Sequence, residues 1–229
     1  MRIEELIKFT KDELSDLLGK PAAILYSDTT TLRKGDIYLL GTNPGGSDNY
    51  TLYEDLKGLE TKTTNAYLDE VWETKNRKPE AGKAVLQKRI QELFENIGYD
   101  LKSICASNLI FFKSVSLETL EYNFTEIANR CWPIHEKILK IVQPKVIIVF
   151  GNSENDSPYQ YLRKKFRAKT TGTIMTGHGK NKAKYFNFKL NGDDCCVIGL
   201  PHLSRFSISN KSVYNWIQEI LKTRGQDTN

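Results

Sequence analysis

The sequence has no apolar run long enough to cross a bilayer, which takes about 20 consecutive apolar residues in a helix. Its first segment, residues 1–14, intersperses acidic and basic side chains and lacks the apolar core of a secretory signal. These two absences give no reason to expect a membrane partner. They predict a cytoplasmic protein.

Cysteine is also scarce. The 229 residues include four cysteines with no C-x-x-C pair, and two adjacent cysteines cannot both point into one simple zinc site. The Gly-Lys-Ser/Thr ending of a phosphate-binding P-loop is missing as well. We therefore expect no metal site, no iron–sulfur cluster and no cofactor. The four cysteines are Cys105, Cys131, Cys195 and Cys196.

Composition is that of an ordinary globular protein, with 39% hydrophobic and 27% charged residues. A chain of this length buries a large core without disulfides or metals. Residues 1–229 are therefore expected to form a single domain that folds alone. No pattern in the sequence identifies a protein partner.

Basic residues are clustered rather than spread evenly. The formal net charge is +5, and lysine and arginine gather in residues 163–169 and again in residues 180–184. One interpretation is a single surface on which Lys164, Lys165 and Lys182 contact DNA phosphates. The alternative, two separate solvated faces, fits the charge pattern equally well.

Short apolar runs at residues 36–40, 107–112 and 145–152 have the composition of buried strands. Segments with helical periodicity at residues 85–97 and 127–142 alternate with them. This alternation predicts an α/β fold, a three-layer αβα sandwich around a central, mainly parallel four-stranded sheet.

Other segments complete the expected fold. Residues 3–18 and 211–222 each have one apolar face and predict two more helices. Two β-prone arms flank Asn191-Gly192-Asp193-Asp194, which predicts a C-terminal hairpin. The polar residues 74–83 are expected to form an exposed loop and residues 224–229 a frayed tail.

Polar or titratable residues stand directly after several of the predicted strands. In open α/β sheets, binding sites lie beyond the carboxyl ends of the strands, where loops present polar groups over a rigid scaffold. A functional site is therefore predicted there. The residues concerned are Asn43, Asn108, Asn152 and His202.

Two of these residues lie in recognisable motifs. The segment Gly41-Thr42-Asn43-Pro44-Gly45, followed far downstream by Pro201-His202-Leu203-Ser204-Arg205, resembles the paired motifs of the uracil-DNA glycosylase superfamily. Asn108 in Ser-Asn-Leu resembles the asparagine that reads the base. The first motif is most similar to the mismatch-specific and single-strand-selective branches, which carry Gly-x-Asn-Pro-Gly. The resemblance is concentrated in three short motifs within residues 36–206.

The resemblance implies a monofunctional DNA glycosylase that flips a pyrimidine out of DNA and leaves an abasic site. Asn43 would orient a water molecule, because an amide is not a useful base near neutral pH. His202 would donate a hydrogen bond to the departing base. Asn108 would read the edge of the base, and Tyr53 or, less favoured, Tyr50 would stack on it. The remaining base-binding residues would be Gly41, Thr42, Pro44 and Gly45.

The segment 203–207 resembles the loop that enters the duplex and props out the target nucleotide. Leu203, Arg205 or Phe206 would be the wedge, and Ser204 would also contact DNA. Leu203 stands where the superfamily usually has proline, which leaves the identity of the wedge open.

The base that would be removed is open. Strict uracil enzymes have a tyrosine that blocks the space beside C5 of the base, and Gly45 stands at the matching position. This predicts tolerance of C5-modified pyrimidines, including the hydroxymethylated or glucosylated cytosine of phage DNA, and hence a role in defence. Mismatch-type uracil enzymes also have glycine there, so repair remains an alternative.

Two other classes of protein are alternatives to a glycosylase. One is a catalytically inert DNA- or nucleotide-binding protein on the same fold. The other, an unrelated nucleotide hydrolase, is disfavoured because the sequence shows no metal-binding carboxylate cluster.

Overall fold

The computed structural model describes residues 3–46, 49–72 and 80–225. Six strands form one mixed sheet in the order β2-β1-β3-β6-β5-β4. The first four of these are parallel to one another, whereas β5 is antiparallel to both β6 and β4. The strands are β1 (Ile37–Gly41), β2 (Cys105–Asn108), β3 (Val146–Phe150), β4 (Gly172–Met175), β5 (Lys182–Leu190) and β6 (Asp193–Leu200).

The sheet has six strands where the sequence predicted four. The four parallel strands match the four-stranded parallel sheet that the sequence predicts. Because β6 is both the fourth of these strands and the second arm of the hairpin, the first arm, β5, joins the same sheet. β4 then pairs with the outer side of β5. The hairpin turn is tighter than expected, because only Asn191 and Gly192 connect the arms. Their φ angles of 54° and 99° are those of a two-residue turn that requires positive φ.

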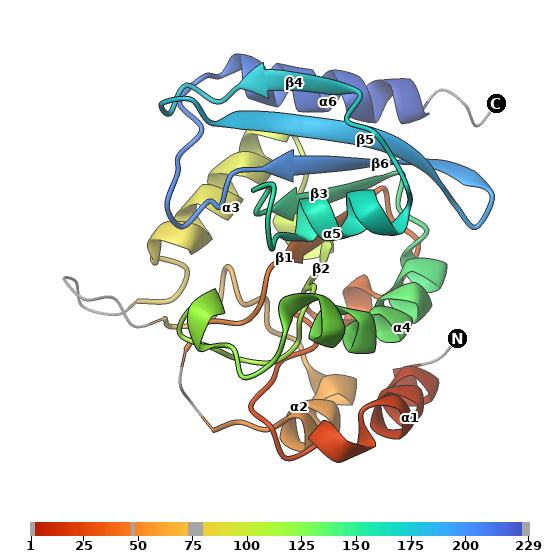
Figure 1. The fold of residues 1–229 in the computed structure, drawn as a ribbon. Coiled ribbons are helices and arrows are strands. Elements are labelled where there is room, and N and C mark those ends of the chain that lie inside the picture. Colours follow the sequence, from red (N-terminus) through yellow and green to blue (C-terminus); the bar gives the residue numbers. More distant parts are fainter. Residues whose placement is uncertain (1–2, 47–48, 73–79, 226–229) are drawn as a thin grey trace.

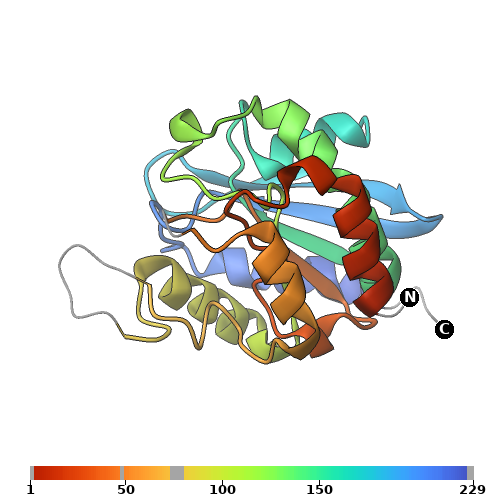
Figure 2. The ribbon, with the colours of Figure 1, turned by 90° about the horizontal axis from the view of Figure 1, so that it is seen from below.

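Helices cover both faces of the sheet (Figures 1 and 2). Apolar side chains of α3 and α6 form one core with β3 residues Val146, Ile148 and Phe150. The intervening residues Ile147 and Val149 face the opposite core, which includes α1, α2, α4 and α5. This alternation forms the expected three layers. The helices are α1 (Ile3–Glu13), α2 (Leu52–Gly58), α3 (Val85–Ile97), α4 (Phe124–Val142), α5 (Pro158–Lys165) and α6 (Ser212–Gly225).

Three predicted elements differ in detail. The strand expected at 107–112 ends at Asn108. The next two residues lie outside the strand, although Leu109 N–H and Ile110 N–H still donate to the carbonyls of residues 41 and 42. The helix expected at 127–142 begins three residues earlier, at Phe124, so Pro133 lies inside α4. The first helix is shorter than residues 3–18 and is followed by a 3₁₀ turn. Residues 74–79 of the expected loop and 226–229 of the expected tail lie outside the described residues.

None of the helices in the described ranges is both long and apolar enough to cross a membrane. The four cysteines are buried and unpaired, and Cys195 and Cys196 point into opposite cores from neighbouring positions on β6. Burial raises the pKa of each thiol well above its usual value.

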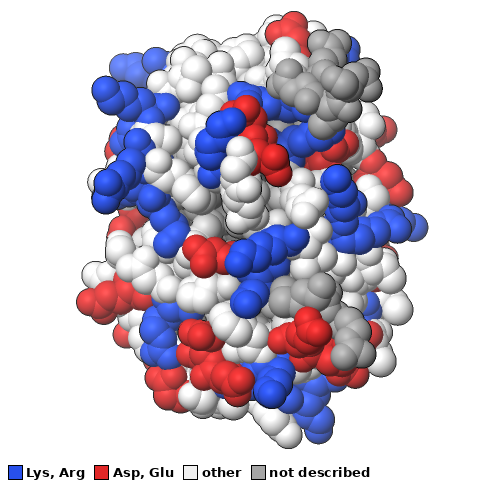
Figure 3. Space-filling model, turned by 90° about the vertical axis from the view of Figure 1, so that its right-hand side faces the viewer, with Lys and Arg blue, Asp and Glu red and all other residues white. Residues whose placement is uncertain are grey.

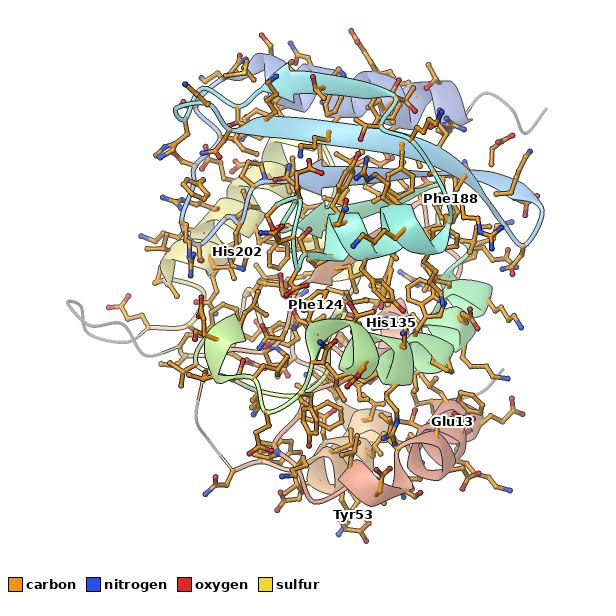
Figure 4. All side chains as sticks on the ribbon, in the orientation of Figure 1. Glu13, Tyr53, Phe124, His135, Phe188 and His202 are labelled. Carbon is orange, nitrogen blue, oxygen red and sulfur yellow. The ribbon has the colours of Figure 1, made fainter. Side chains whose placement is uncertain are left out.

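His135 on α4 is fully buried and lies between the helix and the sheet (Figure 4). Its Nε2 lies 3.1 Å from the carbonyl oxygen of Leu109, which can only accept, so Nε2 carries the proton. Nδ1 then accepts from the Tyr38 hydroxyl at 2.9 Å. Burial lowers the pKa of His135 to about 4, so the folded protein holds this ring neutral.

We expect His135 to make folding stability dependent on pH. Its usual pKa is 6.5, so between pH 6.5 and 4 the unfolded chain takes up a proton that the folded protein excludes. Its contribution is complete above pH 6.5, and lowering the pH to 4 should remove up to about 3 kcal/mol of the free energy of unfolding. Urea unfolding across this range measures the effect. The slope should flatten in His135→Gln but not in His178→Gln, which changes an exposed histidine; equal slopes in both variants would contradict the assignment.

Candidate active site

The four parallel strands bring their carboxyl ends to one edge of the sheet, at the left in Figure 1. Gly41 of β1 pairs with Asn108 of β2, and Phe150 of β3 pairs with Leu200 of β6. Asn43 and His202 each follow the end of a strand by two residues. The structure therefore brings all four predicted polar residues to this edge. Asn152 follows β3 by two residues as well, but its amide donates to the carbonyls of Lys182 and Gly199 and so serves the fold.

Asn43 is half-buried and its amide nitrogen is held by the protein. Nδ2 lies 3.0 Å from the carbonyl oxygen of Pro44 and 2.8 Å from Oγ of Ser114. Because the carbonyl can only accept, the atom facing it is the nitrogen, which fixes the orientation of the amide. Both amide hydrogens are then used. The carbonyl Oδ1 is the atom left to accept a hydrogen bond from water.

Asn108 is 3% exposed, and its side chain lies over the end of β1. A Cβ atom on Gly41 would overlap Oδ1 of Asn108 and would stand 2.7 Å from the Phe150 ring. Two buried side-chain atoms of the described residues lack a hydrogen-bond partner, Nδ2 of Asn108 and the hydroxyl of Tyr67. A buried donor without a partner is costly, so the Asn108 amide is suited to meet an acceptor that enters the site.

His202 is a neutral donor. Its Nδ1 accepts from the backbone N–H of Ser204 at 3.3 Å and faces the Ser204 hydroxyl at 2.8 Å. A backbone N–H can only donate, so the proton lies on Nε2. Burial and, to a lesser extent, the charge of Arg205 lower the pKa of His202. The ring packs edge-on against Phe150, with centroids 5.6 Å apart.

The loop after His202 has one buried and two exposed side chains. Leu203 is 1% exposed in the core beneath α3, and its carbonyl accepts a hydrogen bond from Arg89 at 2.6 Å. Its role as a wedge is therefore contradicted, because the apolar core holds the side chain away from the surface. Ser204 and Arg205 are exposed, and Phe206 is half-buried beside the ring of His178.

The two candidate stacking tyrosines lie in different places. Tyr53 is on α2, with its ring centroid 5.6 Å from Nζ of both Lys11 and Lys57, and Figure 4 shows it far from His202. The structure therefore does not bring Tyr53 together with His202 (Figure 4), because α2, which the sequence did not predict, carries it. Tyr50 lies beneath Lys113, next to Ser114, so its role stays a prediction.

The three predicted phosphate-binding lysines do not share a surface. Lys182 begins β5 beside the end of β6, whereas Lys164 and Lys165 end α5. Phe166, which follows them, stacks on Phe188, and Figure 4 shows Phe188 at the opposite end from His202. Six strand residues, roughly 20 Å, separate Lys182 from that stack. At that opposite end, basic and acidic side chains are interspersed (Figure 3).

Sequence reasoning missed Ser114 and Phe150. Ser114 is an ordinary loop serine in the sequence, and its partner Asn43 lies 71 residues away. Phe150 reads as one more apolar residue of a buried strand, although its ring lies between Gly41 and His202. Thr42 and Pro44 are buried in the turn, whereas Gly45 is exposed.

Comparisons with known proteins give no family for this chain. No family model matches it, and no curated protein matches it. Within the residues that the structure describes, no group of three or more His, Cys, Asp or Glu side chains is placed to hold a metal ion.

Glycine at position 41 should be required by the Asn108 side chain. Gly41→Ala should cost about 1–3 kcal/mol of unfolding free energy, because the added methyl group overlaps the Asn108 amide and the Phe150 ring. Gly45→Ala is the matched control, since within the part of the chain that the structure describes its Cβ would meet no heavy atom within 4 Å other than those of its chain neighbours. Its effect should stay within about 0.5 kcal/mol. Equal urea midpoints for the two variants would show that the space above residue 41 is not filled by Asn108.

Proposed function

We propose that this chain is a monofunctional DNA glycosylase of the uracil-DNA glycosylase type. It would hydrolyse the N-glycosidic bond of a flipped-out, uracil-like or C5-modified pyrimidine and leave an abasic site. The observation that carries the proposal is the buried, unpartnered Nδ2 of Asn108. A carbonyl group of a bound pyrimidine could accept a hydrogen bond from this donor. Leaving a buried donor without a partner costs about 1–3 kcal/mol of free energy, and that bond would remove the cost.

The hydrogen-bonding groups suit a dissociative hydrolysis. The bond between C1′ and the base breaks with its electron pair moving to the base, and positive charge develops on the sugar. Oδ1 of Asn43 orients a water molecule whose oxygen bonds to C1′, and the water's proton is released to solvent because an amide cannot hold it. His202 Nε2–H donates to the base oxygen as negative charge accumulates there.

The finer proposal concerns the base. Apart from its two chain neighbours, no heavy atom of the described residues lies within 4 Å of the position where a Gly45 side chain would begin, which supports room for a substituent at C5. Hydroxymethylated and glucosylated cytosines carry such substituents, so the proposed enzyme would act in defence against phage. Equal or faster removal of uracil from matched oligonucleotides would favour repair instead.

Excision should depend on Asn43. Purified protein is incubated with oligonucleotides that contain uracil, a thymine mismatch or a modified cytosine, and abasic sites are then cleaved with alkali. Asn43→Ala should slow strand breakage on the preferred base by about 100-fold, because the attacking water loses its orientation. Asn96→Ala, which alters an exposed asparagine near the end of α3, should leave the rate unchanged.

The result separates the proposed enzyme from its alternative. DNA binding without strand breaks across the whole panel would identify an inert binding protein. Strand breaks that persist in Asn43→Ala would show that another residue positions the water.

Lys182 should contribute more to DNA binding than the lysines of α5. Lys182→Glu places a negative charge at the edge that carries His202, so affinity should fall and the dependence of binding on salt should decrease by about one unit of slope per lost phosphate contact. The control is Lys164→Glu with Lys165→Glu, which reverses two charges at the far end of α5 and should have the smaller effect. Fluorescence anisotropy with a labelled duplex at several salt concentrations measures both, and a larger effect of the double variant would contradict the assignment.

A further inference from the structure

Two exposed apolar side chains stand on the loop that holds Asn43 in place. Val115 is 76% exposed and Leu117 is 38% exposed. Both belong to residues 113–120, here called the β2–α4 tip, which lies between the end of β2 and the start of α4. Both side chains are accessible to solvent, so a partner could contact them directly.

The β2–α4 tip is tied directly to the candidate site. Ser114 accepts a hydrogen bond from the Asn43 amide, and its backbone N–H donates to the carbonyl of Pro44 at 3.1 Å. The backbone N–H of Lys113 also donates to the carbonyl of Pro21 at 2.9 Å. Val115 therefore follows two residues that hydrogen bonds hold in place, one of them bonded to the turn at residues 41–45, here called the catalytic turn.

The tip itself is held in one shape. Residues 117–119 form a 3₁₀ turn. Ser116 N–H donates to Thr119 Oγ1 at 3.0 Å, and the Thr119 hydroxyl donates to the carbonyl of Ser116 at 3.0 Å. A wedge between stacked bases must resist compression, so a capped turn suits that task better than an open loop.

The tip lies at the same end of the molecule as the loop that follows His202 (Figure 1). A hydrogen bond from Ser116 and, more weakly, the charge of Arg205 in that loop lower the pKa of Glu118. Glu121, the other acid of this segment, is paired with Lys20 at 2.8 Å. In Figure 1 the bright green turn of the tip and the blue loop after β6 lie at the same end of the molecule.

We propose that the β2–α4 tip is a second DNA-entering element, and that Val115 and Leu117 insert beside the target nucleotide of a duplex opposite the 204–206 loop. This inference rests on the proposed function. The two apolar side chains unstack the neighbouring base step from one side, and Arg205 or Phe206 fills the duplex from the other. Because Ser114 joins the tip to Asn43, seating the tip in DNA also seats the catalytic turn.

The test compares duplex and single-stranded DNA that carry the same excisable base. A wedge is needed only where a base must leave a stack, so Val115→Ser with Leu117→Ser should slow single-turnover excision from the duplex by about tenfold and leave the single strand nearly unchanged. Lys140→Ser is the control, because it changes an exposed side chain in the last turn of α4, at the opposite end of that helix from the tip. Its rates on both substrates should match those of the wild type.

A second measurement does not depend on catalysis. In the Asn43→Ala background, a 2-aminopurine beside the target base reports unstacking as a rise in fluorescence when protein binds. The rise should shrink in the Val115→Ser, Leu117→Ser variant at saturating protein. An undiminished rise, equal slowing on both substrates, or a wild-type enzyme that acts on single strands alone would overturn the inference without touching the proposed function. Failure of the wild type to bind DNA would overturn both.

Discussion

The candidate site depends on the pairing of Gly41 with Asn108 across β1 and β2. Only a residue without a side chain at position 41 leaves room for the Asn108 amide beside the Phe150 ring. The two segments remain hydrogen-bonded just beyond the strand ladder, where Leu109 N–H donates to the carbonyl of Gly41. The register between β1 and β2 therefore determines where the buried Asn108 amide lies. It also determines the position of Asn43, two residues after Gly41. A shift of either strand by one residue would turn the amide to the other face of the sheet.

The polar groups brought to this edge are uncharged. Asn43 and Asn108 are amides, and burial keeps the pKa of His202 below its usual value, so its ring is neutral near pH 7. Buried neutral donors need less compensation than buried charges. Their hydrogen bonds strengthen as negative charge develops on a leaving group, which is the condition under which a preorganised donor lowers a barrier.

Sequence patterns predicted the elements with strong local signals and failed where tertiary contacts decide. Burial fixes the VIIVF run of β3, which the sequence predicts, and positive φ angles fix the turn of the predicted hairpin, although that turn is two residues long instead of four. Helix α2 was not expected, although Thr51 and Glu54 form a capping box that marks its start. Leu203 is apolar in the sequence whether it is a wedge or a core residue, and only packing beneath α3 decides. The separation of Lys182 from Lys164 likewise depends on the direction of α5 and β5.

A second glycine keeps the middle of the site open. β3 lies between β1 and β6, so the strand ends that carry Asn43 and His202 are roughly 10 Å apart. Gly151 ends the central strand with a φ of 117°, and a Cβ there would stand 2.9 Å from Thr42 Oγ1 and 3.1 Å from Pro158. Because residue 151 is a glycine, the chain can leave β3 toward α5 without a side chain that collides with Thr42. Under the proposed function, a planar base and its sugar would lie across this edge, with the sugar toward Asn43 and the base oxygen toward His202.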